Sequence, residues 1–455
     1  MAAVSLGEDF DIFGIRGIAR DLDEIVHIRI LERIAQFGFQ TARQLARDTY
    51  YFICHGPIIS FSSVYQAFVK LATYFVGQDI SDIVISEKVA PLVEEIEIGE
   101  LKLRNRFMRS ATHEWLADED GSPTEAIVAI HEALARHDIG LSVSGYAYVS
   151  ADGKGSTGQQ GLHSDHVIPR YRELSDRVHA YGAAFFVQLV HNGRHSFPTE
   201  RCPNPLSASA LPIPGKNIMS KEMTEEEIRR VIRDFVSAIG RCQKARVDGV
   251  QLHCAHGFLL SSFFSPFLNR REDDWGGDTV ARTRMATEII RIAKKKFPGY
   301  PIAVKMNCTD GVEGGIDLRE AIEIAKILSS EGVDAIEISG GIEEAPTNVT
   351  CQRVLSKDQE AYFRQYSREI RKKVDCPVML VGGMRSLDVM RMIILDGYAD
   401  IISMSRPLIR EPDLVSKFIT GRKEEASCVS CNKCFDPTGV KCNRQAGKRS
   451  REKVL

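Results

Sequence analysis

Residues 301–341 read PIAVKMNCTDGVEGGIDLREAIEIAKILSSEGVDAIEISGG, and this stretch contains the unit that decides the fold. The short apolar runs at 301–307 and 335–341 have the length and composition of buried strands. Between them, residues 317–330 repeat apolar side chains with the 3.6-residue period of an amphipathic helix. A strand, a helix and a second strand in this order favour parallel pairing of the two strands.

The same alternation recurs along most of the chain. The strand-like runs are FMRSAT (107–112), LSVSGYAYV (141–149), AFFVQLV (184–190), GVQLHC (249–254), PIAVKMN (301–307), AIEISGG (335–341), PVMLVGG (377–383) and DIISMS (400–405). Helical patterns lie at 123–136, 169–180, 225–246, 317–330, 358–374 and 387–395. Eight strand-like runs with helical patterns between them predict an α/β fold, a parallel (β/α)8 TIM barrel. A doubly wound open sheet is less favoured, because no GxGxxG follows an early strand.

Three segments are predicted: an N-terminal helical extension at 1–92, the barrel at 93–425 and a cysteine-rich tail at 426–455. The extension contains helical patterns at 22–46 and 62–76. Residues 94–106, EEIEIGELKLRNR, predict a hairpin that covers the bottom of the barrel.

The composition excludes several classes of protein. The 59 Lys and Arg residues balance 61 Asp and Glu, so charge gives no basis for binding nucleic acid or an anionic membrane. Residues 49–69 are uncharged, but Gly56-Pro57 interrupts them, which favours a buried helical pair or a partner-facing surface over an integral membrane span. Because Glu8, Asp9 and Asp11 stand where a signal peptide would begin, we expect a cytoplasmic protein.

Two histidines end the fourth predicted strand, and barrel enzymes carry their chemistry at such strand ends. His253 and His256 are three residues apart, so both imidazoles can donate hydrogen bonds to one substrate oxygen. The alternatives are a metal-binding pair, or one core and one surface histidine.

Small residues end the last three predicted strands. Gly341, Gly382 and Gly383 let backbone N–H groups approach an anion, and Ser405 and Arg406 add a hydroxyl and a guanidinium. This predicts a phosphate site, which TIM barrels often form at this position. The alternative is that the glycines serve turn geometry only.

Polar side chains also occur near the ends of the third and fifth predicted strands. Gln188 and Lys305 each interrupt an apolar run, and Lys305 can stabilise negative charge on a bound ring. Alternatively Lys305 reaches solvent or pairs with Asp310 or Glu313.

Four cysteines lie close together in the tail: Cys428, Cys431, Cys434 and Cys442. In a reducing compartment this spacing favours a zinc or iron–sulfur site over free thiols.

Three segments carry a family resemblance: NRFMRSATHEW (105–115), DGVQLHCAHGFLLSSFFSPFLNRREDDWGG (248–277) and ADIISMSRPLIREP (399–412). Together they resemble the Old Yellow Enzyme superfamily of FMN-dependent oxidoreductases. The resemblance implies that NADH or NADPH reduces FMN. Flavin N5 then delivers a hydride to an activated C=C bond, while His253 and His256 hold the carbonyl oxygen of the substrate.

The resemblance also implies which residues contact FMN. Gln188 matches a glutamine that hydrogen-bonds the pyrimidine ring, and Lys305 matches a basic position near N1 and O2. With the phosphate candidates, the predicted FMN contacts are Ser110, Ala111, Thr112, His113, Gly145, Tyr146, Gln188, Lys305, Gly341, Gly382, Gly383, Ser405 and Arg406.

Two positions depart from the family pattern. Phe258 stands where the family usually has a tyrosine that protonates the α-carbon, so Tyr146, His113 or water becomes the candidate donor. CVSCNKC (428–434) is similar to the segment that holds a 4Fe-4S cluster in 2,4-dienoyl-CoA reductase and trimethylamine dehydrogenase, but Cys442 comes earlier than their fourth ligand.

The leading hypothesis is therefore a reductase of an activated alkene. An amine dehydrogenase or demethylase is the alternative, and its sign would be an aromatic bowl formed by Trp115, Tyr146, Tyr148 and Phe258. A flavin-binding sensor or interaction protein with little turnover is the third. The expected partners are a small-molecule substrate, a second copy of the chain in a homo-oligomer, and an electron-donor protein.

Overall fold

The computed structural model describes residues 87–198, 200, 203–347 and 349–444. The chain divides into two units, residues 91–417 with 423–455 and residues 1–90 with 418–422. The first of these contains the parallel sheet. The patterns at 22–46, 49–69 and 62–76 lie outside the described residues, so the predictions made for them stay predictions.

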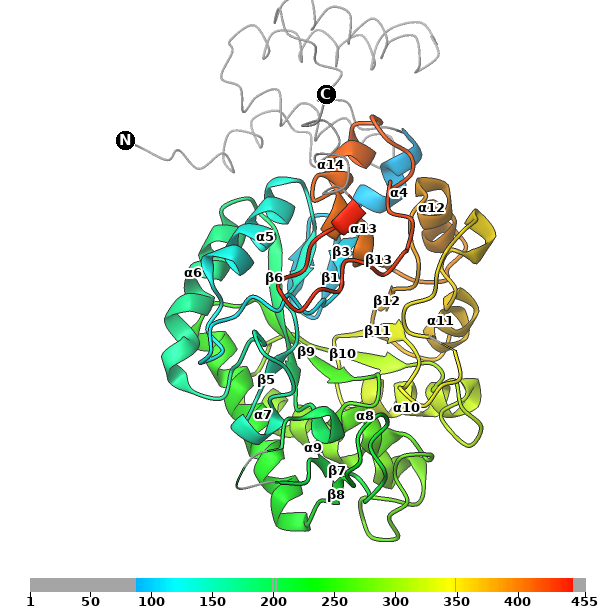
Figure 1. Ribbon diagram of the computed structural model, residues 1–455. Helices are drawn as coiled ribbons and strands as arrows, with labels where there is room; N and C mark the ends of the chain where they lie inside the picture. Colours follow the sequence, from blue (N-terminus) through cyan, green and yellow to red (C-terminus); the bar gives the residue numbers. More distant parts are fainter. Residues whose placement is uncertain (1–86, 199, 201–202, 348, 445–455) are drawn as a thin grey trace, which may run out of the picture. The chain divides into compact units, whose positions relative to one another are not determined.

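A closed parallel barrel forms the centre of the larger unit (Figure 1). Its strands are β3 (Phe107–Arg109), β4 (Leu141–Val143), β6 (Ala184–Val190), β9 (Gly249–Cys254), β10 (Ile302–Asn307), β11 (Ala335–Ser339), β12 (Val378–Leu380) and β13 (Ile401–Met404). Each strand pairs in parallel with the next, and β13 pairs with β3. The predicted (β/α)8 barrel is confirmed, and the open sheet is excluded.

The second predicted strand is interrupted. It forms β4 and then β5 (Ala147–Tyr148), which pairs with the outer end of β6. At Gly145 a side chain would collide with the carboxylate of Glu114, so only glycine fits there. Tyr146 consequently lies in the gap between β4 and β5, at the C-terminal end of the barrel.

Helices α5 to α12 surround the strands (Figure 1). The described helices are α4 (Ala90–Val93), α5 (Glu125–Arg136), α6 (Ile168–His179), α7 (Glu225–Lys244), α8 (Leu259–Phe264), α9 (Thr279–Lys296), α10 (Leu318–Ser330), α11 (Arg364–Arg371), α12 (Leu387–Leu395), α13 (Arg406–Arg410) and α14 (Leu414–Ile419). At the start of α7, Thr224 Oγ1 accepts a hydrogen bond from the Glu227 N–H and the Glu227 carboxylate accepts one from the Thr224 N–H. This capping box fixes where the helix begins.

The helix predicted at 358–374 is shorter than expected, since α11 begins only at Arg364. Ala361 has φ +51°, a left-handed conformation that interrupts a right-handed helix. The carboxylate of Glu360 accepts hydrogen bonds from the N–H groups of Arg385 and Ser386, both at 2.8 Å. The segment before α11 therefore anchors the loop after β12.

The predicted hairpin consists of β1 (Ile96–Ile98) and β2 (Leu101–Leu103). Its buried residues Ile98 and Leu103 belong to one apolar cluster with Leu141 and Ala335, the first residues of β4 and β11. Because the cluster includes the N-terminal ends of the barrel strands, the hairpin closes the bottom of the barrel and leaves the opposite end for a site.

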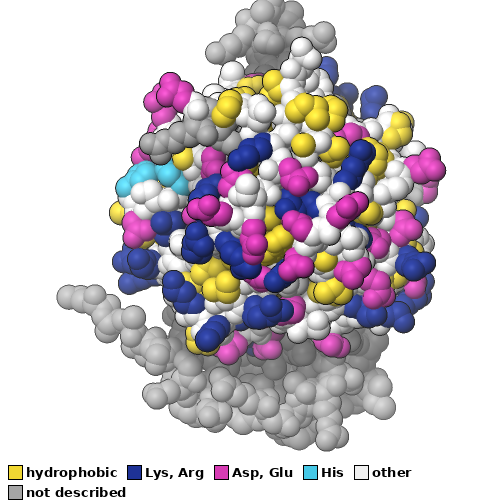
Figure 2. All heavy atoms as spheres, turned by 90° about the horizontal axis from the view of Figure 1, so that it is seen from below, with side chains coloured by type: hydrophobic (Ala, Val, Ile, Leu, Met, Phe, Trp, Pro, Cys, Tyr) yellow, Lys and Arg dark blue, Asp and Glu magenta, His cyan; other side chains and the backbone are white. Residues whose placement is uncertain are grey.

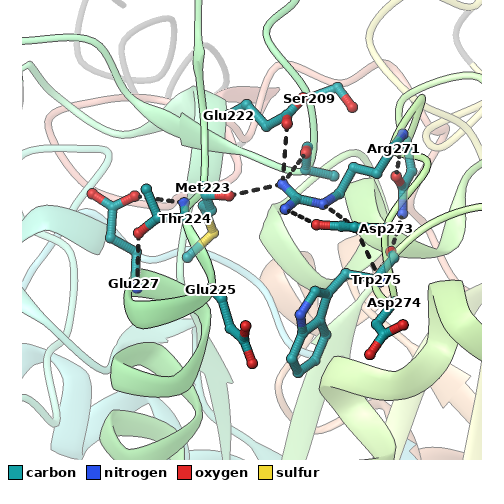
Figure 3. A network of polar contacts seen from close by, with 12 residues as sticks. Ser209, Glu222, Met223, Thr224, Glu225, Glu227, Arg271, Asp273, Asp274 and Trp275 are labelled. Atoms are coloured by element: carbon teal, nitrogen blue, oxygen red, sulfur yellow. Dashed lines mark hydrogen bonds and ion pairs between the residues drawn. The ribbon is translucent and has the colours of Figure 1, made fainter.

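A buried arginine anchors the long loops beside the barrel. Arg271 Nη1 donates to the carbonyl oxygens of Ala208 at 3.0 Å and Met223 at 2.8 Å, and its Nε donates to Asp273 at 2.9 Å (Figure 3). Ala208 and Met223 follow the short parallel pair β7 (Leu206–Ser207) and β8 (Lys221–Glu222). The NRREDDWGG segment (269–277) belongs to the loop after α8. Arg271 therefore binds this loop to the loop after β6.

None of the helices within the described ranges is both long and apolar enough to cross a bilayer. On the face shown in Figure 2, basic and acidic side chains of the described residues alternate. The mixture of charges on this face agrees with the balanced charge of the sequence. A surface of mixed charge attracts a polyanion only weakly.

Candidate active site

A cavity of about 240 Å³, the inner cavity, lies at the C-terminal ends of the barrel strands. Twelve of the predicted site residues line it: Ser110, Ala111, Thr112, His113, Tyr146, Gln188, His253, His256, Lys305, Gly383, Ser405 and Arg406. A second cavity of about 550 Å³, the outer cavity, shares Tyr146, His256, Phe258 and Thr350 with the first. The barrel thus brings together residues that are far apart in the sequence.

Three predicted contacts lie outside the inner cavity. Gly341 lines the outer cavity. The N–H of Gly145 donates to the buried Glu114 carboxylate at 3.1 Å, and Gly382, with φ +136°, packs against a tyrosine ring. The positions of Gly145 and Gly382 agree with a role in backbone geometry, and contact of these three glycines with FMN stays a prediction.

A buried polar network supports the inner cavity. The Lys305 ammonium donates to Ser110 Oγ at 2.9 Å and lies 3.4 Å from the Glu337 carboxylate. Glu337 also accepts hydrogen bonds from Ser110 and Ser403, both at 2.6 Å, and from Gln251 at 2.9 Å. Lys305 is therefore held inside the barrel by Glu337.

This pairing corrects the alternatives considered for Lys305, which neither reaches solvent nor pairs with Asp310 or Glu313. Glu337 is not among the site residues predicted from the sequence. The feature that could have indicated it is its position as a single acidic residue in the middle of the apolar strand AIEIS (335–339), where an unpaired charge would be costly.

The two histidines are fixed in different ways. Their ring centroids lie 5.2 Å apart, and the ring planes are nearly perpendicular at 89°. The Ala255 N–H donates to His253 Nδ1 at 3.4 Å, which leaves the proton of a neutral ring on Nε2. His256 Nε2 hydrogen-bonds Ser339 Oγ at 2.8 Å, and the His256 N–H donates to Asn307 at 3.1 Å. Both rings are therefore preorganised at the cavity wall.

Burial keeps both imidazoles neutral near neutral pH. It lowers the pKa of His253 well below its usual value, and the neighbouring His256 and Lys305 lower it further. Burial, followed by the charge of Lys305, lowers the pKa of His256 to about 3. Near neutral pH both rings can therefore donate hydrogen bonds but carry no positive charge.

Aromatic rings form another part of the wall. The centroids of Phe258 and Tyr146 lie 5.3 Å apart, and those of Trp115 and Phe435 lie 6.4 Å apart. All four rings line the inner cavity. Tyr148 instead stacks on a histidine outside it. Three of the four predicted bowl residues thus come together, and Phe435 joins them from the tail.

A buried ion pair holds the loop after β3. Arg109 Nη2 donates to Glu114 Oε1 at 2.7 Å. Burial alone would raise the pKa of Glu114, but Arg109 and His131 outweigh it and lower the pKa to about 2. The carboxylate stays charged and fixes the loop that carries His113.

The tail folds against the inner cavity through Ser430 and Phe435. Asn432 Oδ1 accepts a hydrogen bond from Arg406 Nη1 at 2.6 Å, and Asn432 Nδ2 donates to the carbonyl oxygen of Cys351 at 2.9 Å. Arg406 is therefore bound by the tail, and its contact with a phosphate stays a prediction.

The four tail cysteines line a pocket of about 20 Å³, where Arg410 donates to Cys442 Sγ at 3.3 Å. Among the described residues, no three or more His, Cys, Asp or Glu side chains are arranged to hold a metal ion. The metal-binding prediction is therefore unsupported.

The donor set of the inner cavity fits FMN. Gln188, Lys305 and Ser110 present an amide, an ammonium and a hydroxyl to it. At Gly383, with φ +74°, a Cβ would come within 2.5 Å of Val354, so glycine is needed for this backbone path. A flat heterocycle with polar ring edges matches these groups.

Comparisons with known proteins agree with this chemistry. The model of the NADH:flavin oxidoreductase / NADH oxidase family matches residues 91–425. The NADH oxidase of Thermoanaerobacter brockii is 37% identical over 348 residues, which are 75% of this chain and 52% of that protein. The 4,4'-dithiodibutanoate disulfide reductase of Rhodococcus erythropolis is 29% identical over 395 residues, 77% of this chain and 94% of that protein.

Among solved structures, 2-naphthoyl-CoA reductase in complex with 2-naphthoyl-CoA aligns with a TM-score of 0.71 and 28% identity. The alignment covers 76% of this chain and 54% of that one. The chain thus spans about half the length of this reductase and of the NADH oxidase, and nearly the full length of the disulfide reductase.

Proposed function

The chain belongs to the NADH:flavin oxidoreductase / NADH oxidase family, and from this premise we propose that it is an FMN-dependent enzyme that reduces an activated carbon–carbon double bond with NADH or NADPH. An α,β-unsaturated carbonyl or enoyl-type compound is the proposed substrate. The observation that carries the proposal is the pair of buried, neutral imidazoles of His253 and His256 beside a cavity that fits a flavin.

The histidine pair supports an oxygen-binding role. Reduction at the β-carbon moves negative charge onto the carbonyl oxygen, and fixed N–H donors at that oxygen stabilise the developing charge. His253 Nε2 carries its proton because Nδ1 accepts the Ala255 N–H, and Ser339 holds the ring of His256. Neither ring must reorient during the reaction, which favours catalysis in a dry site.

The network around Lys305 supports the binding of FMN. When bound, FMN supplies the hydride that the β-carbon accepts. Lys305 provides a cation beside the inner cavity, and Glu337 fixes that cation and offsets part of its charge. Gln188 lies next to the same network, because its Nε2 donates to Gln251 Oε1 at 2.7 Å. These side chains would orient the polar edge of the ring.

The test is an anaerobic single turnover. The holoenzyme is reduced with NADH or NADPH and mixed with 2-cyclohexenone while flavin absorbance is followed. We expect rapid reoxidation without oxygen, and a loss of roughly 100-fold or more in the His253→Ala/His256→Ala double variant. His166→Ala is the matched control, because His166 is 43% exposed and pairs with Asp120 outside both cavities.

A protein that is reduced but not reoxidised by enones contradicts the proposal. The absorbance of the flavin also separates the other functions. Reduction of the oxidised flavin by amines would point to an amine dehydrogenase. Inertness toward both enones and amines would point to a flavin-binding sensor.

An aromatic wall favours amine oxidation as the second candidate. Trp115, Tyr146 and Phe258 line the inner cavity, and the faces of such rings attract cations. Among the described residues that line the inner cavity, however, there is no Asp or Glu to pair with an ammonium group. Alkene reduction therefore remains the first proposal.

A further inference from the structure

Resting on the alkene reduction proposed above, we infer that Tyr146 protonates the α-carbon of the substrate and that Ser156 and His113 connect it to solvent. The need for such a group arises at Phe258, whose ring carries no proton to donate. Tyr146 lies next to that ring, with the two centroids 5.3 Å apart.

Tyr146 occupies the junction of the two cavities, since it lines both. Its ring centroid is 6.1 Å from that of His253 and 4.8 Å from that of His113. A substrate whose oxygen is bound by the histidine pair therefore places its neighbouring carbons within the reach of this phenol. Burial raises the pKa of Tyr146, so the phenol keeps its proton until the carbanion forms.

Ser156 connects the phenol with His113. Hydrogen bonding from Ser156 lowers the pKa of the Tyr146 phenol and so opposes the effect of burial, and Ser156 Oγ lies 2.6 Å from His113 Nε2. Gln159 Oε1 accepts the N–H groups of Gly155 at 2.8 Å and Ser156 at 3.3 Å. The Ser156 loop is thus fixed beside Tyr146, and Ser156 itself is only half-buried.

The step balances in atoms and electrons. The β-carbon gains a hydride, and the π electrons of the alkene move toward the carbonyl oxygen held by the histidines. The α-carbon then takes the proton of the Tyr146 hydroxyl, which leaves a phenolate. The phenolate takes a proton from Ser156 Oγ. Ser156 regains one from water, or from His113 Nε2 as His113 Nδ1 takes a proton from water, so one solvent proton is consumed for each hydride.

The other nearby groups are less suited to this role. His253 and His256 use their N–H groups on the substrate oxygen. His195 lies 5.3 Å from Phe258 by ring centroids but lines only the outer cavity. Among the described residues, Tyr146 is the tyrosine whose phenol lies near both the histidine pair and the hydroxyl of Ser156.

The decisive comparison is Tyr146→Phe against Tyr148→Phe, since Tyr148 lies two residues further along and stacks outside the inner cavity. Reduced holoenzymes are mixed with cyclohexenone or with a quinone, which needs no protonation at carbon. We expect Tyr146→Phe to slow enone reoxidation by roughly 100-fold and to affect quinone reoxidation far less. Tyr148→Phe should change neither rate, and Tyr146→Phe/Phe258→Tyr should recover much of the enone rate.

An unchanged enone rate in Tyr146→Phe, with an active wild-type enzyme, overturns this inference alone. A wild-type enzyme that reacts with quinones but not with enones overturns the proposed function and this inference with it. If Tyr146→Phe does not fold, Ser156→Ala decides. In protein labelled with [ζ-¹³C]tyrosine, this substitution should shift one tyrosine resonance, and enone turnover should fall. If the resonance does not shift, or if enone turnover does not fall, the inference is overturned.

Discussion

The phenyl ring of Phe258 packs against the imidazole of His253, with centroids 4.6 Å apart and planes inclined by 54°. The contact brings a ring without a donor directly beside the proposed oxygen-binding pair. Chemistry at the α-carbon must therefore use a group other than residue 258, and this position offers a direct way to measure how far proton delivery limits turnover.

Phe258→Tyr adds a hydroxyl at this place. We expect single-turnover reoxidation of the reduced enzyme by cyclohexenone to rise a few-fold, because general acid catalysis gains from a second donor near the carbanion. Rates are measured at saturating cyclohexenone, with Phe267→Tyr as a control outside the inner cavity. An unchanged or lower enone rate in Phe258→Tyr would show that proton delivery does not limit the reaction.

Lys305 and Glu337 should change the reduction potential of bound FMN in opposite directions. Lys305→Gln removes the cation that favours the reduced, more negative flavin, so the potential should fall. Glu337→Gln removes the charge that offsets Lys305 at 3.4 Å, so the potential should rise. For a unit charge in a buried site we expect shifts on the order of tens of millivolts.

Equilibration with redox dyes measures both potentials. Glu331→Gln is the control, because Glu331 pairs with Arg291 at 2.5 Å on the outside of the barrel and should leave the potential unchanged. Shifts of the same sign in Lys305→Gln and Glu337→Gln would contradict the assigned electrostatics.

Most of the fold could be predicted from the sequence, because each barrel strand is a short apolar run with a helix after it. The failures have local causes. The left-handed conformation of Ala361 shortens a helix, and a close approach of Glu114 to Gly145 interrupts a strand. Neither effect leaves a mark in hydrophobic periodicity, because both depend on residues that become neighbours only in the folded barrel.

The candidate site could be predicted in part for the same reason. Strand ends identify His253 and Lys305, since the barrel topology brings all strand ends together. The partner of Lys305 could not be assigned, because Glu337 belongs to another strand and looks like an isolated irregularity. The contact of Phe435 with the cavity depends on how the tail folds back, which no periodic pattern encodes.

The histidine pair predicts a flat pH profile for the reaction with enones. Burial lowers the pKa of His256 to about 3 and that of His253 well below its usual value. Both rings therefore stay neutral through the pH range around the usual histidine pKa, and their hydrogen bonds do not change across it. Stopped-flow reoxidation across this range should show no ionisation near the usual histidine pKa. A rate that falls with an apparent pKa near 6.5 would contradict neutral donors.

His113 predicts a pH dependence of stability. Burial lowers its pKa from 6.5 to about 4 in the fold, although Glu114 opposes the shift. Between these values the unfolded chain binds the proton and the folded chain does not, so stability is full above the unfolded pKa and falls as the pH falls. Each such group contributes a slope of about 1.4 kcal/mol per pH unit in this window.

Urea denaturation at several pH values tests this. His113→Gln should reduce the slope of the unfolding free energy between these two pKa values by about one proton. His166→Ala, which alters an exposed histidine for which no such burial applies, is the control. An equal slope in wild type and His113→Gln would contradict burial of a neutral ring.

Arg271 predicts a large effect on stability without a direct effect on chemistry. Its guanidinium is buried, and it binds Asp273 and the carbonyl oxygens of Ala208 and Met223 in a fixed fork (Figure 3). Lysine has one ammonium and cannot reproduce this geometry, so Arg271→Lys should lower the free energy of unfolding by about 3 kcal/mol. The neighbouring Arg270 is exposed, and Arg270→Lys is the matched control. Thermal unfolding measures both variants. Equal stability would show that the bonds of this arginine are dispensable, whereas a loss of enone rate in fully folded Arg271→Lys would assign the segment to catalysis.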